Sequence, residues 1–584
     1  MTNPQKPSFW TGRYALAVLL VFVAIGNYVT LEKDNIPLTR EASGWYQNSL
    51  FLYESVNSLF HIDGRPLQDK VEAVARDAMS SEKAKTLVLL TYPIYLMSGP
   101  GHDAAIMANL FFLVILGFSV YGIGKLIHDQ ATGFVAASVC ILMPAVYASS
   151  RAFVPVFGLT AMISLNIYLL IRTNGFMNRK YAVLFALSSV LSFYTRPSFS
   201  IYLIGPFLVA LLSGLRATKA ARKCVLPNMA YMAAISFVLG LPQYLIHSSN
   251  TDYFAMRLWT LGASLKMLFA GDIYGGITFK AIWGSFQYLL GSFYLILFML
   301  SLVWFLMQKT RHGSVLLAWI IVPVPILFVN YLADYGDWHW MIVRQLIICL
   351  PAFALIMALF LTKFCSSARG SLADSGPDPA PSRLSRTLDH RMIQAVLILA
   401  VILSGLFNFI SCSFFFGMCP RPNVFPNDSE TANFVGRFTP LEPEWDYGEL
   451  LALVDQNRGA AVFFFSMDPV YEILQTHILR ENILNPGDEP YKVRLCYQAW
   501  RNSSGKGALW TDPELCREWL RESSLVVFKK ESDLTGEIVE NPYGRHLTYS
   551  HWTNNLSGDY ILVKTLNGSL GSGIEVFKKR QQER

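Results

Sequence analysis

Long apolar runs separated by short polar segments dominate the chain. The first run extends from Tyr14 to Leu31, and a helix of about 20 residues crosses the apolar core of a bilayer. Further runs of similar length follow at 103–126, 132–149, 154–171, 181–194, 198–215, 226–247, 283–307, 314–332, 341–362 and 393–411. The pattern predicts a polytopic α-helical membrane protein with about eleven transmembrane helices.

Basic residues are concentrated in every second segment between these runs. Cytoplasmic loops of membrane proteins are enriched in Lys and Arg, so this alternation predicts a cytoplasmic N-terminus. The net charge of +7 then reflects orientation, and we expect no nucleic-acid partner. The inner segments contain Lys125; Arg172, Arg179 and Lys180; Arg216, Lys219, Arg222 and Lys223; Lys309 and Arg311; and Lys363, Arg369, Arg383, Arg386 and Arg391.

Two parts of the chain are polar enough to fold outside the bilayer. Residues 32–102 form a first external loop that includes WYQNSLFLYESVNSLF, whose helical spacing of apolar residues predicts interfacial helices. The tail alternates the strand-like runs AAVFFFS, SLVVFKK, YILVKTL and IEVFKK with the helical run DPVYEILQTHIL. That order predicts a small α/β domain. We therefore expect a transmembrane domain at 1–411 and a periplasmic α/β domain at 412–584.

The segment 364–391 differs from both parts in composition. It is rich in Ser, Pro, Gly and Asp and has no hydrophobic period. A segment of this kind buries too little apolar surface to fold by itself. We expect a flexible cytoplasmic linker that carries no chemistry.

Four cysteines fall on the expected external side, where an oxidising compartment permits disulfides. Close spacing favours pairing of Cys412 with Cys419 and of Cys496 with Cys516. Four cysteines allow three connectivities, and free buried thiols stay an alternative. None of the four has the spacing of zinc ligands.

Three arginines depart from the charge pattern because each lies at the outer end of a predicted helix. They are Arg151 in SSRAF, Arg196 in YTRPS and Arg344 in MIVRQL. A guanidinium at that depth is costly unless it is paired, and its parallel N–H donors match a phosphate. Each arginine alone could instead reach lipid headgroups or pair with a carboxylate. Three at one level favour a shared anionic ligand, such as the phosphate of a lipid carrier.

The external side also carries candidate acid and base groups. Asp34 and Glu41 follow the first predicted helix directly, where a carboxylate can act as general base on an acceptor hydroxyl or amine. Either could instead cap a helix or lie in solvent. His339 lies beside Asp337 in DYGDWHWM and could help to bind an acceptor or a divalent metal, although a place in an interfacial aromatic belt fits it better.

Four segments of the chain resemble the GT-C superfamily of membrane glycosyltransferases, in the branch of protein O-mannosyltransferases and aminoarabinose transferases. They are PLTREA around Glu41, TYPIYLMSG with Tyr92 and Pro93, the run from Ala105 to Leu170, and VRQLIICLPAFALIMALF from Val343. Their order and topology carry the resemblance, because each motif alone is weak. In two respects the chain departs from the family: Val156 stands after Pro155 where an Asp is common, and the paired acids of the first loop are reduced to Glu41.

This resemblance implies a glycosyltransferase that uses a polyprenyl-phosphate-linked sugar and inverts the anomeric carbon. The base would be Glu41, with a pKa raised by desolvation and with Asp34 as a second candidate. Arg196 and Arg344, and with them Arg151, would bind the lipid phosphate, while Tyr92 and His339 would be secondary contacts with substrate. The acceptor would be a lipid, a glycan or a protein. No cofactor is certain, and a divalent metal is allowed.

Two other classes of function stay open. A transporter or flippase of lipid-linked sugar would usually show internal repeats and ionisable residues at the bilayer midplane, and the sequence shows neither. A non-catalytic GT-C relative would fit the missing Asp after Pro155. We expect the protein in a bacterial inner membrane.

Overall fold

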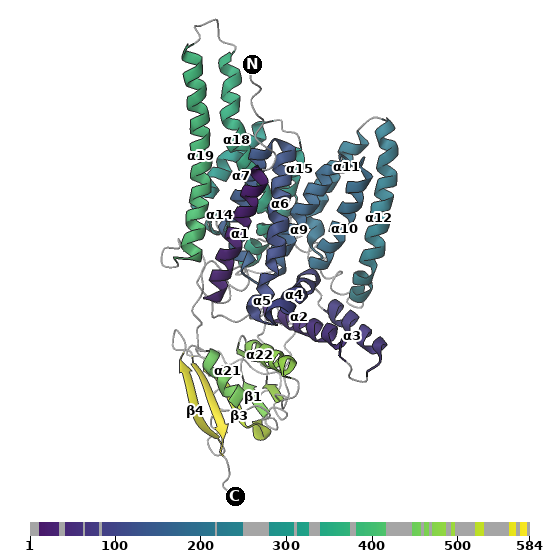
Figure 1. The fold of residues 1–584 in the computed structure, drawn as a ribbon, viewed down its shortest axis with the longest axis vertical. Helices are drawn as coiled ribbons and strands as arrows, with labels where there is room; N and C mark the ends of the chain where they lie inside the picture. Colours follow the sequence, from purple (N-terminus) through teal and green to yellow (C-terminus); the bar gives the residue numbers. More distant parts are fainter. Residues whose placement is uncertain are drawn as a thin grey trace, which may run out of the picture.

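The computed structural model describes residues 11–33, 41–61, 65–80, 84–216, 219–248, 279–308, 312–325, 339–373, 381–415, 447–456, 461–465, 470–485, 492–496, 520–530, 560–567 and 573–580. Most of these residues form a large bundle of helices, and a smaller sheet domain lies at one end of it (Figure 1). The first described helix, α1 (Thr11–Glu32), begins at the other end of the bundle (Figure 1). We call the end next to the sheet domain the site face and the other end the opposite face.

The bundle is made of helices from the apolar runs, as the sequence predicts. They are α1 (Thr11–Glu32), α6 (Asn109–Ile127), α7 (Gln130–Leu142), α8 (Pro144–Ser150), α9 (Pro155–Arg172), α10 (Arg179–Thr195), α11 (Phe199–Leu215), α12 (Lys219–Ser248), α14 (Phe279–Met307), α15 (Gly313–Ile321), α18 (Leu350–Ala373) and α19 (Pro381–Ser413). Before α18 the chain forms α17 (His339–Leu346) and a short 3-10 helix (Ile347–Cys349).

Within the described ranges, seven helices are long and apolar enough to cross a membrane. An eighth span is formed if α7 and α8 count as one, although the chain bends by 65° between them. The bend follows from Pro144, which disfavours a helical Met143 and begins α8. The other predicted spans fall on the shorter helices α10, α11 and α15, so a polytopic membrane protein is confirmed while the count of eleven stays a prediction.

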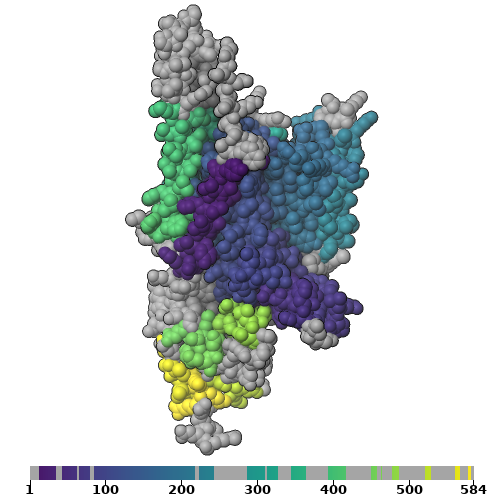
Figure 2. All heavy atoms as spheres, viewed as in Figure 1, coloured from purple at the N-terminus to yellow at the C-terminus, as the bar shows by residue number. Residues whose placement is uncertain are grey.

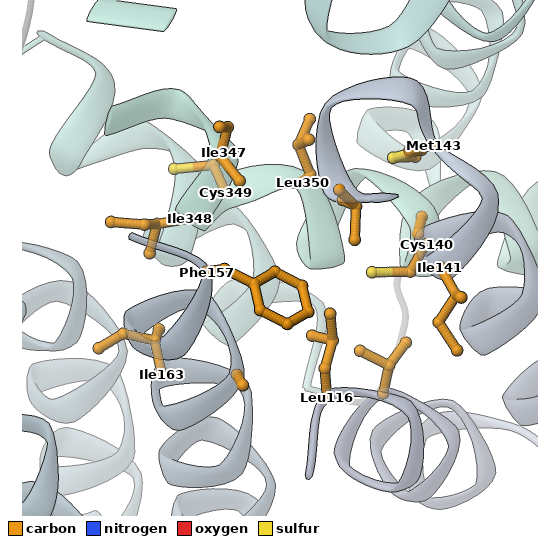
Figure 3. Packing of buried hydrophobic residues seen from close by; sticks show 14 of the residues in the cluster. Leu116, Cys140, Ile141, Met143, Phe157, Ile163, Ile347, Ile348, Cys349 and Leu350 are labelled. Carbon is orange, nitrogen blue, oxygen red and sulfur yellow. The ribbon is translucent and has the colours of Figure 1, made fainter. Parts of the chain in front are cut away.

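The centre of the bundle is closely packed. Figure 3 shows Phe157, Cys140 and Cys349 among aliphatic side chains from several helices. Close approach is possible at Gly124 of α6 and Gly133 of α7, because a Cβ on Gly124 would lie 2.7 Å from the Cα of Gly133. Many large apolar side chains on the outside of the bundle are exposed, as a lipid-facing surface requires.

A layer of four helices covers the site face. They are α2 (Glu41–Ser58), α3 (Leu67–Ser80), α4 (Lys85–Ser98) and α5 (His102–Met107). Figure 1 shows them between the bundle and the sheet domain. The helical spacing in the first loop therefore predicted α2 correctly. The place of α2 in the membrane interface stays a prediction.

The tail forms a mixed five-stranded sheet of the order β2-β1-β3-β5-β4. Its strands are β1 (Ala461–Phe465), β2 (Lys492–Cys496), β3 (Leu525–Lys530), β4 (Tyr560–Asn567) and β5 (Gly573–Lys579), accompanied by α21 (Tyr447–Gln456) and α22 (Val470–Leu484). β1 is parallel to β2 and β3, whereas β5 is antiparallel to β3 and β4. The α/β character predicted for the tail is confirmed, and β2 is a strand that the sequence did not predict. The boundary at 411 stays a prediction.

The segment 364–391, which the sequence predicts as a flexible cytoplasmic linker, is helical at both of its ends, and the linker itself stays a prediction. α18 continues to Ala373 and α19 already begins at Pro381. A helix that is nucleated in an apolar segment adds further residues at little cost, since each new residue gains one backbone hydrogen bond. Polar composition alone therefore did not mark where these two helices end.

Candidate functional site

Arg196 is held at the outer end of α10 by the residues on both sides of it. It caps α10 in an extended conformation (φ −164°, ψ 127°), as expected before Pro197. The preceding residue, Thr195, accepts a hydrogen bond of 3.0 Å at its carbonyl oxygen from the backbone N–H of Ala84. That contact joins the end of α10 to the beginning of α4.

Lys85 is a functional candidate that the sequence did not reveal. It follows Ala84 directly, as Arg196 follows Thr195, so the Ala84–Thr195 bond brings the backbones of Lys85 and Arg196 close together. The Lys85 side chain is fully buried, and burial lowers its pKa from 10.5 to about 8. Ala84 itself adopts a left-handed conformation (φ 68°), which is strained for a residue with a Cβ. The strained backbone therefore lies at the residue directly before the buried Lys85.

Gln345 connects Arg196 to the helix that carries Arg344. In the amide orientation that satisfies both neighbours, the Gln345 carbonyl accepts from the two terminal nitrogens of Arg196 at 3.2 and 3.0 Å. Its NH₂ group then donates to the Tyr202 hydroxyl at 2.9 Å. The Tyr202 hydroxyl also donates to the Gln345 backbone carbonyl at 3.2 Å. The Arg196 guanidinium is therefore held by Gln345, the residue that follows Arg344 in the sequence.

Arg344, a residue of α17, contacts the helix α2 that begins at Glu41. Its side chain is only 2% exposed, and the guanidinium carbon lies 5.8 Å from the centre of the Trp45 ring. A cation over an aromatic face at this distance is stabilised. Trp45 is four residues after Glu41 on α2, which is roughly one helical turn or about 6 Å. The Glu41 backbone therefore begins α2 about one turn from the residue that contacts Arg344, while its side chain lies outside the described atoms.

Arg151, the third predicted arginine, has its own set of partners inside the bundle. It is fully buried, donates from Nε to the Asn27 side-chain oxygen at 2.9 Å, and donates from a terminal nitrogen to the Ser413 hydroxyl. Its guanidinium carbon also lies 5.0 Å from the Tyr147 ring and 5.2 Å from the Phe409 ring. These contacts join α1, α8 and α19. No contact in the described part of the chain links Arg151 to Lys85, Arg196 or Arg344.

The other predicted residues fall at the edge of the described structure. Tyr92 is half-buried on α4, and its hydroxyl lies 3.4 Å from the Asn57 side-chain oxygen on α2. Asp34 and the side chain of His339 lie outside the described residues, as do Cys419 and Cys516. Cys412 takes part in a disulfide whose partner lies outside them, and Cys496 ends β2. Both disulfide pairings stay predictions.

Metal binding has no support among the described side chains. In that part of the chain, no three His, Cys, Asp or Glu residues lie together in a group that could hold a metal ion. Asp34, Asp337 and the His339 side chain lie outside this part of the chain. A divalent metal therefore stays a prediction of the sequence.

The arrangement of Lys85, Arg196 and Arg344 can bind an anion. The segments that carry the three cations are joined at the site face by the Ala84–Thr195 backbone bond and by the contact of Gln345 with Arg196. Two of the cations are guanidinium groups that can each donate parallel N–H bonds to phosphate oxygens. Burial of Lys85 and Arg344 reduces solvent screening of their charges. The beginning of α2, with Glu41, lies on one side of this cluster, which we call the cation cluster.

Comparison with known proteins supports the fold. No protein-family model matches the sequence, and no curated protein matches it significantly. ArnT from Cupriavidus metallidurans in the apo state has a similar structure, with a TM-score of 0.58 and 12% sequence identity over 97% of this chain and 98% of ArnT. The structure of that ArnT bound to undecaprenyl phosphate gives a TM-score of 0.55 and 12% identity over 96% of this chain and 98% of ArnT.

The chain therefore has the fold of ArnT, with a bundle of apolar helices and a sheet domain at one end. Its similarity to ArnT extends over nearly the whole of both chains. The GT-C resemblance drawn from the four sequence segments is confirmed at the level of the fold. At 12% identity, neither activity nor substrate follows from this likeness.

Proposed function

We propose that the protein is a glycosyltransferase that moves a sugar from a polyprenyl-phosphate-linked donor to an acceptor at the external face of the membrane. The proposal rests on the contacts that join the segments of Lys85, Arg196 and Arg344 to one another and to the first turns of α2, namely Ala84–Thr195, Gln345–Arg196 and Arg344–Trp45. An anionic ligand at this place would have its lipid chain in the bilayer and its charged group at the site face. The undecaprenyl phosphate bound by the structurally similar ArnT is a ligand of that kind.

In the proposed reaction the three cations bind the donor phosphate. The acceptor oxygen or nitrogen attacks the anomeric carbon from the side opposite the phosphate, and the bond from that carbon to the phosphate oxygen breaks. The electron pair goes to the phosphate, where the cation cluster stabilises the added charge. Glu41 takes the proton of the acceptor, with Asp34 as the second candidate. A single displacement of this kind inverts the configuration of the sugar.

Arg151 has a supporting role in this proposal. Its bonds to Asn27 and Ser413 fix α1 against α19, and α1 leads directly to the segment before Glu41. The acceptor would be a lipid, a glycan or a protein. Val156, which stands where the family commonly has an Asp, is fully buried in the first turn of α9 and carries no titratable group. Proton transfer therefore falls to Glu41 or Asp34 in the first loop.

The direct test is transfer of labelled sugar from a panel of polyprenyl-phosphate donors to membrane extracts by the purified protein. We expect transfer by the wild type and its loss in Glu41→Gln with donor binding retained. Glu54→Gln is the matched control, because Glu54 is an exposed carboxylate on the same helix about 20 Å further along it. Equal transfer by the wild type and Glu41→Gln would refute the role of Glu41. Absence of donor binding would refute the proposed function.

A further inference from the structure

A second group of cations lies at the opposite face of the bundle, outside the candidate site. It consists of Arg13 near the beginning of α1, Lys125 near the end of α6 and Arg172 at the end of α9. Arg13 and Arg172 are both close enough to act electrostatically on Lys125. All three are accessible to solvent in part. We call them the opposite-face cluster.

A close contact between α1 and α6 brings Arg13 to Lys125. A Cβ on Gly12 would lie 3.3 Å from the Tyr121 hydroxyl oxygen. Arg13 follows Gly12 directly, and Lys125 lies one turn after Tyr121 on the same side of α6. The two cations therefore flank one contact between the helices.

The contact between α6 and α9 brings Arg172 to the same level. A Cβ on Gly122 would lie 2.6 Å from the Tyr168 ring, and Arg172 lies one turn after Tyr168. The Arg172 guanidinium donates to the Tyr181 hydroxyl and lies 4.6 Å from the centre of the Tyr181 ring. It is thus oriented before any ligand arrives.

A buried hydroxyl lies at the contact between α1 and α6. Tyr121 is 3% exposed, and its hydroxyl has no hydrogen-bond partner among the described residues. An unsatisfied buried hydroxyl costs about 1–3 kcal/mol. Because the hydroxyl is the atom of Tyr121 nearest to Gly12, it lies at the contact between α1 and α6 beside which Arg13 and Lys125 stand in the sequence. A ligand with an acceptor oxygen there would satisfy it.

The helices around this group supply little negative charge. The sequences of α6, α7 and α9 contain no Asp or Glu, and the acid of α1, Glu32, is at its other end. Asp129, between α6 and α7, caps α7 and accepts from the Thr132 backbone N–H at 2.8 Å and from its hydroxyl at 2.7 Å. The net charge of the group and of these neighbouring helices is therefore positive.

We propose that the opposite-face cluster, together with the Tyr121 hydroxyl, binds the phosphate of an anionic membrane phospholipid in the leaflet away from the candidate site. The lipid phosphate accepts from Arg13, Lys125 and Arg172, and one of its oxygens accepts from Tyr121. Basic pockets between transmembrane helices are known to hold anionic headgroups. The bound lipid joins α1, α6 and α9 at their shared end. This proposal does not depend on the sugar-transfer reaction.

The test compares lipid retention and thermal stability of the purified full chain in detergent. Phosphatidylglycerol, phosphatidylcholine and inorganic phosphate are added separately. We expect phosphatidylglycerol to be retained and to raise the unfolding temperature, with little effect of the other two. A stabilising effect of inorganic phosphate equal to that of phosphatidylglycerol would refute a lipid site. No preference for phosphatidylglycerol over phosphatidylcholine would refute the proposal as a whole.

Two variants and a control separate binding from folding. Tyr121→Phe removes only the hydroxyl, so without lipid it should be at least as stable as the wild type, and it should retain roughly fivefold less phosphatidylglycerol. Lys125→Gln should lose retention as well. Arg216→Gln removes an exposed cation after α11, outside the cluster, and should change nothing. Equal loss in Arg216→Gln, or full retention in Tyr121→Phe and Lys125→Gln, would overturn the site.

Discussion

At the scale of single residues, the shape of the Arg344 side chain matters as much as its charge. Arg344→Ala should weaken binding of a polyprenyl-phosphate donor by about tenfold or more, since charge-assisted hydrogen bonds are worth roughly 1.5–3 kcal/mol. The donor affinity of Arg344→Lys should lie between those of the wild type and Arg344→Ala, because Lys keeps the charge over Trp45 but loses the parallel donors. Donor titration of the three proteins checks the order. Identical dissociation constants would remove Arg344 from the phosphate site.

Burial makes Lys85 a source of pH dependence. Its pKa lies at about 8, so the side chain is protonated below that pH and loses its charge above it. Affinity for a sugar phosphodiester lipid, whose own charge is constant in this range, should therefore fall roughly tenfold between pH 7 and pH 9. Lys85→Arg should bind equally at both pH values. A wild type whose affinity is unchanged up to pH 9.5 would contradict the assignment.

The same residues show what a sequence can say about a site. Arg196 and Arg344 stood out because a charge interrupts an apolar run, and Glu41 because it follows the first span. Lys85 gave no such signal, since its proximity to Arg196 depends on the Ala84–Thr195 backbone bond between distant segments. Arg151 gave the same signal as the other two arginines, yet it is surrounded by Asn27, Ser413 and aromatic rings. Sequence marks unusual charges but not their partners.

At the scale of secondary structure, the contact between α6 and α7 depends on small residues. A Cβ on Gly133 would lie 2.5 Å from the Tyr121 backbone oxygen and 3.1 Å from the Lys125 backbone nitrogen. Because backbone atoms cannot move away, Gly133→Ala should destabilise the protein by about 1–3 kcal/mol. Gly44→Ala is the control, since nothing lies within 4 Å of its added Cβ. Thermal unfolding in detergent checks both, and equal midpoints would show that α6 and α7 can separate freely.

Elements were predictable where their pattern was long. An apolar run of spanning length specifies a helix almost by itself, because backbone groups in a bilayer must be satisfied within the segment. β2 was not predictable, since KVRLC is short and carries two cations. It lies at the edge of the sheet and pairs only with β1, so solvent can accommodate those charges. Where α18 ends and α19 begins was equally hidden in the polar composition between them.

At the scale of the whole molecule, the sheet domain contacts the layer of α2–α5 helices through α22. Arg480 donates from Nε to the Pro100 carbonyl at 2.8 Å, and Leu479 and Ile483 pack against the core of the bundle. Tyr46 of α2 lies within electrostatic reach of Arg480. Figure 2 shows α22 directly beneath the helices of the site face. The sheet domain therefore supports the helix that begins at Glu41.

This contact predicts an effect on turnover without an effect on donor binding. Leu479→Glu combined with Ile483→Glu places two carboxylates in the contact, so α22 should detach from α2 and the backbone amides of α2 should exchange hydrogen faster. Sugar transfer should fall several-fold because Glu41 loses its fixed position, whereas the donor dissociation constant should stay within about twofold because the cations lie on α4, α10 and α17. Asn485→Glu, at an exposed position of the same segment, should leave both unchanged. Faster hydrogen exchange in α2 with sugar transfer intact would mean that the sheet domain stabilises the layer of α2–α5 without positioning Glu41. Unchanged exchange would mean that α22 does not hold α2 in place.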